Sequence, residues 1–154
     1  MSHSLPAELR KVEANLLCGG ITMKLDVIRE LNADHARLAS TLGVLSGRPE
    51  LDAEAVRLLK DVRAQLTAHL EREDRKLYPE MRAAAEKNEG LREMLKVMGL
   101  EMNEISAKAV ALIDGWIAGK GAGRFAEDFA FLHALLKDRI QREENKLYAK
   151  YLKL

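Results

Sequence analysis

The sequence predicts an all-α protein, an antiparallel, up-down four-helix bundle with a short N-terminal helical arm. Two observations predict this fold class. Helix-favouring Ala, Leu, Glu, Lys and Arg dominate the 154 residues, whereas there are only 3 prolines and 5% aromatic residues. Four long segments carry apolar residues at helical spacing, and short stretches containing Gly, Pro or Asn separate them. We expect the arm over residues 1–21 and the bundle over residues 22–154.

The N-terminal arm has the signals of a short helix. Ser4 can cap it, and Pro6 falls in its first turn. Its apolar stripe consists of Leu5, Leu9, Val12 and Leu16. Because such a stripe needs a surface to cover it, we expect the arm to pack on the bundle or on a second copy of the chain, as a homodimer. Cys18 is the only cysteine, which excludes an intramolecular disulfide and a cysteine-based zinc site.

Two helices are expected in the first half of the bundle. One runs from about Thr22 to Leu45 and ends at the Gly- and Pro-containing segment 46–49. Its predicted buried face consists of Leu25, Ile28, Leu31, His35, Leu38, Leu42 and Leu45. The next begins near Asp52, a good N-cap, and runs to about Lys87, with Pro79 expected to bend its last turns. Its predicted buried face consists of Val56, Leu59, Val62, Leu66, His69, Leu70, Glu73, Leu77 and Met81.

Two further helices complete the bundle. One runs from about Leu91 to Ala118, after a break at residues 88–90. Its predicted inward residues are Leu95, Met98, Met102, Ile105, Ala109, Ile113 and Trp116. The last runs from about Arg124 to Tyr151, after the glycine-rich link 119–123. Its predicted inward residues are Phe125, Phe129, Leu132, Leu136, Ile140, Glu143 and Leu147.

Composition excludes several classes of function. The formal net charge is only +1, which argues against a nucleic-acid partner, because such proteins usually carry a basic excess or stripe. No apolar stretch approaches the roughly 20 residues of a membrane span, so no membrane association is expected. The N-terminus also lacks the apolar run of a secretory signal, which makes the cytoplasm the expected location.

Residues 69–81 and 139–151 are two copies of one segment. The first reads His-Leu-Glu-Arg-Glu-Asp-Arg-Lys-Leu-Tyr-Pro-Glu-Met and the second Arg-Ile-Gln-Arg-Glu-Glu-Asn-Lys-Leu-Tyr-Ala-Lys-Tyr. In the first copy His69 lies four residues before Glu73, so both share one helix face. In the second copy Glu143 is retained, but Arg139 stands where the histidine would be. The duplication predicts pseudo-two-fold symmetry between the second and fourth helices.

Four polar side chains fall on faces predicted to be buried: His35, His69, Glu73 and Glu143. A buried carboxylate costs several kcal/mol unless it is paired or bound to a metal. Two carboxylates that face each other therefore need a metal cation, a proton or a basic side chain between them. At about 1.5 Å per residue, Glu73, Met102, Arg139 and Glu143 can share one layer, whereas the first helix fits that layer less well.

These residues make the chain resemble the hemerythrin-like (HHE cation-binding) family over residues from about 24 to 151. The resemblance rests on Asp34-His35, on His69-x-x-x-Glu73 with Leu-Tyr-Pro at residues 77–79, and on Glu143 with Leu-Tyr at residues 147–148. It implies a four-helix bundle with a non-haem di-iron centre. In the family, histidines of the first two helices serve one iron, those of the last two serve the other, and the carboxylates bridge.

The chain departs from the family pattern at two positions. Met102 and Arg139 stand where the resemblance implies histidines of the same iron. Arginine stays protonated in proteins and cannot ligate a metal, and a thioether is a poor ligand for ferric iron. A guanidinium four residues before Glu143 can, however, pair with that carboxylate. We therefore expect one non-haem metal, Fe first and Mn or Zn as alternatives, with Arg139 in place of the second cation.

The expected ligands of this single metal are His35, His69, Glu73 and Glu143. With such a site, the resemblance implies sensing of a small ligand such as oxygen or nitric oxide, redox sensing or iron handling. The alternative is a metal-free, degenerate bundle that acts as an interaction or structural module. An enzyme is less favoured, because ferritin-like oxidase chemistry relies on two metals. Tyr78 and Tyr148 are interpreted as core tyrosines with satisfied hydroxyl groups.

Overall fold

A computed structural model describes residues 21–154, and within them the chain forms helices and no strand. The elements are α2 (Ile21–Ser46), α3 (Ala53–Arg72), η1 (Glu73–Leu77), α4 (Tyr78–Ala85), α5 (Glu89–Ile117), η2 (Ala122–Arg124), α6 (Phe125–Arg142), η3 (Glu143–Leu147) and α7 (Tyr148–Leu152). The predicted all-α class and helical bundle are confirmed. The predicted arm, apart from Ile21, and any homodimer formed through it lie outside the described residues.

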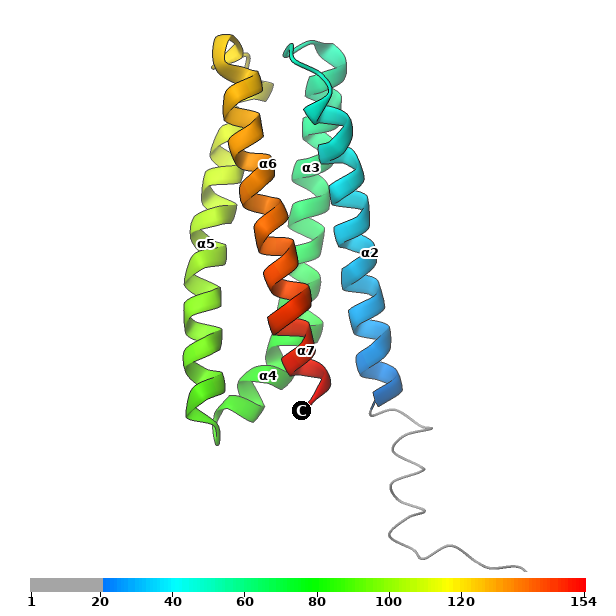
Figure 1. The fold of residues 1–154 in the computed structure, drawn as a ribbon, viewed down its shortest axis with the longest axis vertical. Coiled ribbons are helices and arrows are strands. Elements are labelled where there is room, and N and C mark those ends of the chain that lie inside the picture. The colour runs from blue at the N-terminus through cyan, green and yellow to red at the C-terminus, as the bar shows by residue number, and fades with distance from the viewer. Residues whose placement is uncertain (1–20) are drawn as a thin grey trace, which may run out of the picture.

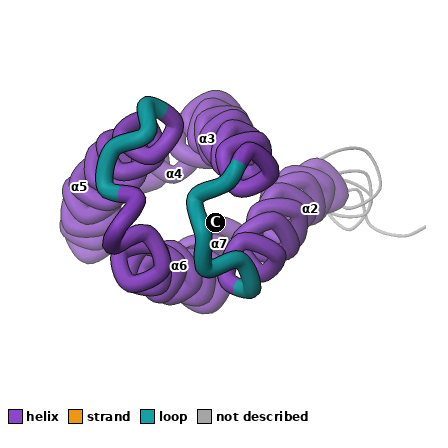
Figure 2. The backbone as a smooth tube through the Cα atoms, turned by 90° about the horizontal axis from the view of Figure 1, so that it is seen from above, coloured by secondary structure: helices purple, strands orange, loops and turns teal. Residues whose placement is uncertain are grey.

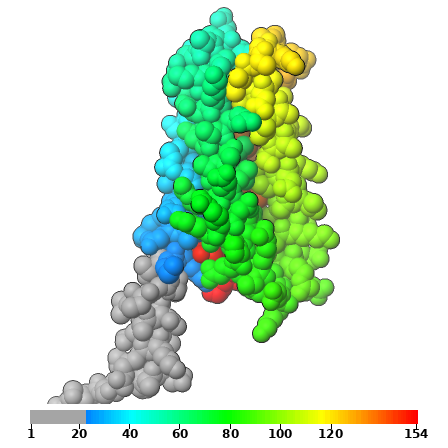
Figure 3. All heavy atoms as spheres, turned by 180° about the vertical axis from the view of Figure 1, so that it is seen from behind, coloured from blue at the N-terminus to red at the C-terminus, as the bar shows by residue number. Residues whose placement is uncertain are grey.

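Long helical rods lie side by side in the bundle (Figure 1). They are α2, α3 continued by α4, α5, and α6 continued by α7. The α2–α3 and α5–α6 links lie at one end, and the α4–α5 link lies at the other. Seen from above, the rods follow the cyclic order α2, α3, α5, α6 (Figure 2), and each packs against its two neighbours. From behind, α3 and α4 lie beside α5 (Figure 3).

Side-chain caps fix the start of two helices. Asp52 accepts a hydrogen bond from the backbone N–H of Ala55 at 2.8 Å, as its predicted N-cap role requires. Asn88 accepts one from the N–H of Leu91 at 3.0 Å. Because Asn88 is a cap as well as a break, α5 begins at Glu89, two residues earlier than predicted.

Two π turns interrupt the rods formed by the duplicated segments, and the sequence did not predict them. η1 begins at Glu73 and η3 begins at Glu143. The backbone N–H of Tyr78 donates to the Glu73 carbonyl, and that of Tyr148 donates to the Glu143 carbonyl, which is the spacing of a π turn. Equivalent residues in the two copies thus form the same irregularity, and in each copy it starts at the buried carboxylate.

Pro79 lies in the first turn of α4, directly after η1. Proline has no N–H to donate and its ring crowds the preceding turn, so a straight continuation of α3 is unfavourable there. Figure 1 shows α4 leaving the line of α3, as the sequence predicted for this position. In the second copy Ala149 stands at the corresponding place, and α7 runs on to Leu152.

The core consists of two apolar clusters with a polar layer between them. One cluster lies toward the α2–α3 link and includes Leu38, Leu66 and Leu136, and the other includes Leu31, Leu77 and Leu147. The buried polar residues between them are Asp34, His35, His69, Glu73, Arg139 and Glu143. Leu25, which the periodicity placed on the buried face, is 38% exposed, because burial along α2 begins only at Ile28.

Within the part of the chain that the structure describes, none of the helices combines the length and the apolar character that a membrane span needs.

Candidate metal centre

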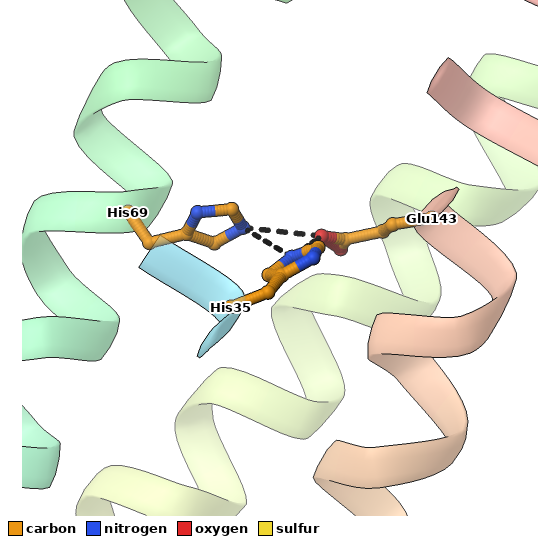
Figure 4. A group of neighbouring side chains, drawn as sticks. All are labelled: His35, His69 and Glu143. Carbon is orange, nitrogen blue, oxygen red and sulfur yellow. Dashed lines mark hydrogen bonds and ion pairs between the residues drawn. The ribbon is translucent and has the colours of Figure 1, made fainter. Parts of the chain in front are cut away.

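Three side chains from three different rods point toward one another in the polar layer (Figure 4). His35 Nε2 lies 3.1 Å from His69 Nε2 and 3.0 Å from Glu143 Oε1. His69 Nε2 lies 3.1 Å from the same Glu143 oxygen. All three side chains are buried, with exposed fractions of 2–4%. The bundle therefore brings two imidazole nitrogens and one carboxylate oxygen to a single point.

The other nitrogen of each imidazole ring is held by a carboxylate. His69 Nδ1–H donates to Asp34 Oδ2 at 3.2 Å, and His35 Nδ1–H donates to Glu144 Oε1 at 3.1 Å. Because an ionised carboxylate can only accept, each Nδ1 carries the hydrogen. In the neutral rings both Nε2 atoms are then lone-pair donors directed inward, which is the arrangement of metal-bound histidines backed by carboxylates.

Asp34 is itself fixed by two arginines. Its Oδ1 accepts hydrogen bonds from Arg37 and Arg72, each at 2.7 Å, while Oδ2 faces His69. The buried Asp34 carboxylate is thus compensated by guanidinium groups at the rim. Asp34, the residue directly before His35 in the chain, therefore holds the His69 ring in its orientation.

Glu73 completes the group with one oxygen that lacks a partner. Its Oε2 accepts a hydrogen bond from the Tyr148 hydroxyl at 3.0 Å. Its Oε1 is buried, lies 3.5 Å from His69 Nε2 and has no hydrogen-bond partner among residues 21–154. Burial, and next the negative charge of Glu143, raise the pKa of Glu73 well above its usual range. A carboxylate in this position needs a cation or a proton.

Tyr148 reaches the group because of the π turn. Its hydroxyl lies 3.3 Å from both Glu143 Oε1 and His35 Nε2, in addition to its bond to Glu73. In a regular α-helix, residues five apart point in directions about 140° from each other. The wider turn of η3 brings Tyr148 back toward the face of Glu143. The expectation of a satisfied hydroxyl holds for Tyr148, but its partners are the polar residues of this group.

Arg139 holds the second oxygen of Glu143. Its Nε–H donates to Glu143 Oε2 at 2.7 Å, one Nη1–H donates to the Met98 carbonyl at 3.0 Å, and the residue is 2% exposed. Burial alone would raise the pKa of Glu143, but the charge of Arg139 and the hydrogen bonds that His35 and His69 donate when their rings are protonated hold it well below its usual range. Glu143 is therefore an ionised carboxylate between a guanidinium and two imidazoles.

Met102 lies on α5 at the edge of the polar layer. It is 8% exposed and belongs to the apolar cluster that also contains Ile105 and Leu136. It lines a small cavity together with Glu73, which agrees with the shared layer predicted for these two residues. Its observed surroundings are those of a packing residue at the position where the resemblance implied a histidine.

Comparison with known proteins adds the family. A model described as Hemerythrin HHE cation binding domain matches residues 26–151, which is most of the chain. The chain belongs to the hemerythrin HHE cation-binding family. A search of curated proteins and a search of solved structures found no match.

The residues present in this HHE domain fit a metal ion. Among residues 21–154, the ligand atoms of His35, His69 and Glu143 form a group that could hold one, with all of them within 4.8 Å of one another. Glu73 is not a member of that group, but its partnerless Oε1 lies beside it. Two imidazoles and one or two carboxylates form a donor set that suits Fe, Mn or Zn. Arg139 and Met102 offer no such ligand atom.

Sequence reasoning missed three residues of this HHE site. Asp34 and Glu144 hold the imidazole rings, and Tyr148 contacts three members of the group. Asp34 carried a signal, since the Asp34-His35 pair was one of the residues behind the resemblance. Tyr148 reaches the group through the π turn that begins at Glu143, which helical periodicity did not predict.

Proposed function

We propose that this protein binds one metal ion, iron first with manganese or zinc as alternatives, in a mononuclear site. The ligands would be His35 Nε2, His69 Nε2, Glu143 Oε1 and the free Oε1 of Glu73. The observation that carries the proposal is the convergence of the first three atoms, 3.0–3.1 Å apart, with both Nδ1 atoms already bound to carboxylates. Unshared lone pairs directed at one another repel unless a cation lies among them.

Arg139 would take the place of a second metal. Its guanidinium is permanently charged and is bound to Glu143 Oε2, whereas both histidines contact Oε1. Comparison of the two duplicated segments supports this substitution. His69 lies four residues before Glu73, and Arg139 lies four residues before Glu143. This reasoning takes the bundle as antiparallel and up-down, the order that the short links favour.

The residues around the site define what it would do. Asp34 and Glu144 orient the imidazole rings, and Tyr148 holds a hydroxyl hydrogen directed at Glu73. A bound iron would supply an open coordination position for a diatomic molecule such as oxygen or nitric oxide. Because no second metal is provided for, we propose sensing of such a ligand, redox sensing or iron handling in preference to oxidase chemistry.

A metal-free interaction or structural module is the second candidate, and one observation favours it. Burial disfavours a charged His35, but the hydrogen bonds to Glu143 and Glu144 and the charges of these two carboxylates together outweigh this and raise the pKa of His35. A proton on His35 Nε2 can therefore take the place of a metal between the histidines and Glu143. This arrangement leaves Glu73 Oε1 without a partner within the described residues, which is why we rank it second.

Metal analysis of the protein expressed with iron supplementation tests the proposal. We expect close to one metal ion per chain by elemental mass spectrometry, and loss of that metal in His69→Ala. His133→Ala is the matched control, because His133 is a half-buried histidine outside the polar layer and should leave the metal content unchanged. A metal-free wild-type protein after reconstitution with iron, manganese and zinc would support the interaction module. Two metal ions per chain would contradict the role given to Arg139.

A further inference from the structure

The two copies of the duplicated segment use their tyrosines differently. Tyr148, in the second copy, donates to Glu73 of the first copy at 3.0 Å. Pseudo-two-fold symmetry would have Tyr78 donate to Glu143 in the same way. Instead Arg139 occupies Glu143 Oε2, and the buried hydroxyl of Tyr78 has no partner among the residues that the structure describes. The arginine that replaces a metal ligand has therefore also displaced a tyrosine.

The partnerless hydroxyl lies at a small cavity between the α3–α4 rod and α5. The cavity has a volume of about 210 Å³, and its lining includes Tyr78, the buried residues Glu73 and Met102, and the exposed residues Arg82 and Asn103. It lies on the face where α3 and α4 meet α5 (Figure 3). Because its lining includes exposed as well as buried residues, a small molecule has a route from solvent to the Glu73 side of the polar layer.

The absence of a side chain at Gly99 of α5 contributes to the volume of the cavity. Gly99 lines the cavity, and a Cβ added to it would meet no atom within 4 Å apart from its own helix neighbourhood. A volume of about 210 Å³ corresponds to several water molecules at roughly 30 Å³ each. The space is thus suited to a ligand of a few heavy atoms and too small for a typical cofactor.

A second unused donor belongs to Arg139, which is bound to α5 just before the cavity residue Gly99. Arg139 Nη1–H donates to the carbonyl of Met98, the residue before Gly99, whereas its buried Nη2 has no partner within residues 21–154. Burial, and next the negative charge of Glu73, raise the pKa of Tyr78, whereas the charge of Arg139 lowers it, so the guanidinium acts on the Tyr78 hydroxyl. Arg82 adds a cation over the face of the Tyr78 ring, 5.5 Å from its centre.

The charges around the cavity also favour a negatively charged ligand once a metal is bound. One divalent ion and Arg139 would bring three positive charges against the two carboxylates of Glu73 and Glu143. Asp34 is paired with arginines, while Glu144 is 40% exposed and Asp74 of the cavity lining is also exposed, so solvent screens both. Glu101 Oε2 lies 3.9 Å from Arg139 Nη1, but Glu101 is 39% exposed and is shared with Arg142. It therefore compensates the remaining buried positive charge only in part, and a buried charge of this kind is costly.

We propose that this cavity binds one small monoanion of the carboxylate or oxyanion class, which accepts a hydrogen bond from the Tyr78 hydroxyl beside the Arg139 guanidinium. The charge argument rests on the proposed single-metal site, whereas the cavity and its donors do not. On this proposal, the side of the site where Met102 and Arg139 replace the histidines of the family has become an anion pocket.

Nuclear magnetic resonance of the zinc-loaded, tyrosine-labelled protein tests the pocket with formate as the probe in chloride-free buffer. The chain has only 3 tyrosines, so the Tyr78 ring signal can be assigned by substitution. We expect a saturable shift of that signal and little shift for Tyr151. Because Tyr78→Phe removes the reporter signal, formate affinity in the variants is measured from the line width of isotope-labelled formate. Binding should weaken roughly tenfold in Tyr78→Phe, which loses one hydrogen bond to an anion, and it should be lost in Gly99→Leu, which fills the cavity. Gly115→Leu is the matched control, because Gly115 is another α5 glycine with open space around its Cβ.

Three outcomes would overturn the pocket: no saturable shift, a response shared equally by the three tyrosines, or formate affinity unchanged in both Tyr78→Phe and Gly99→Leu. Each would mean that only water fills the cavity. Zinc content measured on the same samples separates this failure from failure of the metal site. If formate binds through Tyr78 in a chain that takes up no metal, the anion pocket is supported and the proposed single-metal site is contradicted.

Discussion

The Nε2 atoms of His35 and His69 lie 3.1 Å apart, and each ring donates its Nδ1 hydrogen to a carboxylate. Two neutral imidazoles in this orientation present lone pairs to each other. Glu143 Oε1 adds a third acceptor at 3.0–3.1 Å from both. The arrangement is electrostatically unfavourable without a cation in the middle, and either a metal ion or a proton can supply it.

The Asp34 carboxylate should contribute to metal affinity although it would not touch the metal. Asp34→Asn keeps the size of the side chain but removes the charge that orients the His69 ring. Loss of such a backing carboxylate typically lowers metal affinity 10- to 100-fold, so we expect a loss of roughly that size. Competition with a chromophoric chelator measures it. Asp138→Asn is the control, since Asp138 pairs with Arg142 outside the site, and equal affinity in the two variants would contradict the backing role.

Glu73→Gln should have opposite effects on the metal-free and metal-loaded protein. The folded state raises the pKa of Glu73, so between the ordinary carboxyl pKa and this raised value the folded chain holds a proton that the unfolded chain has released. By linkage, stability conferred by that proton is present below the ordinary pKa and is lost as pH rises through the folded-state value. Glutamine has no such loss, so metal-free Glu73→Gln should unfold at a higher temperature than wild type near about pH 8 and show a smaller advantage near about pH 5.

The metal-loaded comparison supplies the control for Glu73→Gln. An amide is a weaker metal ligand than a carboxylate, so the stabilisation gained on adding metal should be smaller in the variant than in wild type. Thermal unfolding with chelator and with excess metal measures both effects on one sample. If Glu73→Gln lowered the unfolding temperature of the metal-free protein at the higher pH, Glu73 would already be compensated by a group other than a proton or a metal.

Much of this architecture could be predicted from the spacing of residues. Burial of His35, His69, Glu73 and Glu143 follows from their place on apolar helix faces, and the structure shows all four buried. The pairing of Arg139 with Glu143 follows from a spacing of four residues on a helix. Both inferences use only α-helical periodicity, and they hold because α2, α3 and α6 are regular up to the polar layer.

The π turns mark where that reasoning stops. They begin at Glu73 and Glu143. The residues predicted to be buried beyond them, Leu77, Met81 and Leu147, are buried, but the regular helical spacing did not place Tyr148 in the polar group. In the structure Tyr148 contacts the polar group, while the hydroxyl of Tyr78, expected to be satisfied, is left without a partner among residues 21–154. Single π turns inside α-helices are rare and often lie at functional sites, and α-helical periodicity alone does not place them. The role of Tyr148 was accessible only from the folded backbone.

Chelation should lower the thermal stability of the protein if the metal binds as proposed. A ligand that binds only the folded state stabilises it by about 2.7 kcal/mol when its free concentration is 100 times Kd. For a chain of this size that corresponds to a shift of roughly 5–10 °C in Tm. We expect a shift of this order between metal-saturated and chelated wild type, and none in His69→Ala. An unchanged Tm in wild type would favour the metal-free interaction module.

Arg139→Met should destabilise the metal-free protein strongly. The substitution keeps an unbranched side chain but removes the cation bound to the buried Glu143 carboxylate and to the Met98 carbonyl. Removing one partner of a buried ion pair typically costs roughly 3–5 kcal/mol, because the remaining charge stays buried. Arg142→Met is the control, since Arg142 forms its ion pairs at a more exposed position and should cost about 0–1 kcal/mol. Chemical denaturation with chelator present measures both, and equal costs would show that the Arg139 pair is screened by solvent.

The double substitution Met102→His with Arg139→His should restore a second metal. Residue 139 lies four residues before Glu143, as His69 lies before Glu73, and Met102 lines the same cavity as Glu73. Two imidazoles would then be supplied on the side of the layer that now holds the guanidinium, and both carboxylates could be shared by two ions. We expect two iron atoms per chain and the charge-transfer absorption typical of a bridged pair, whereas Met102→His alone should keep one iron because Arg139 still carries its charge. A double variant that retains a single iron would mean that the loss of the second metal is fixed by the backbone positions of α5 and α6, and that Arg139 only fills the space.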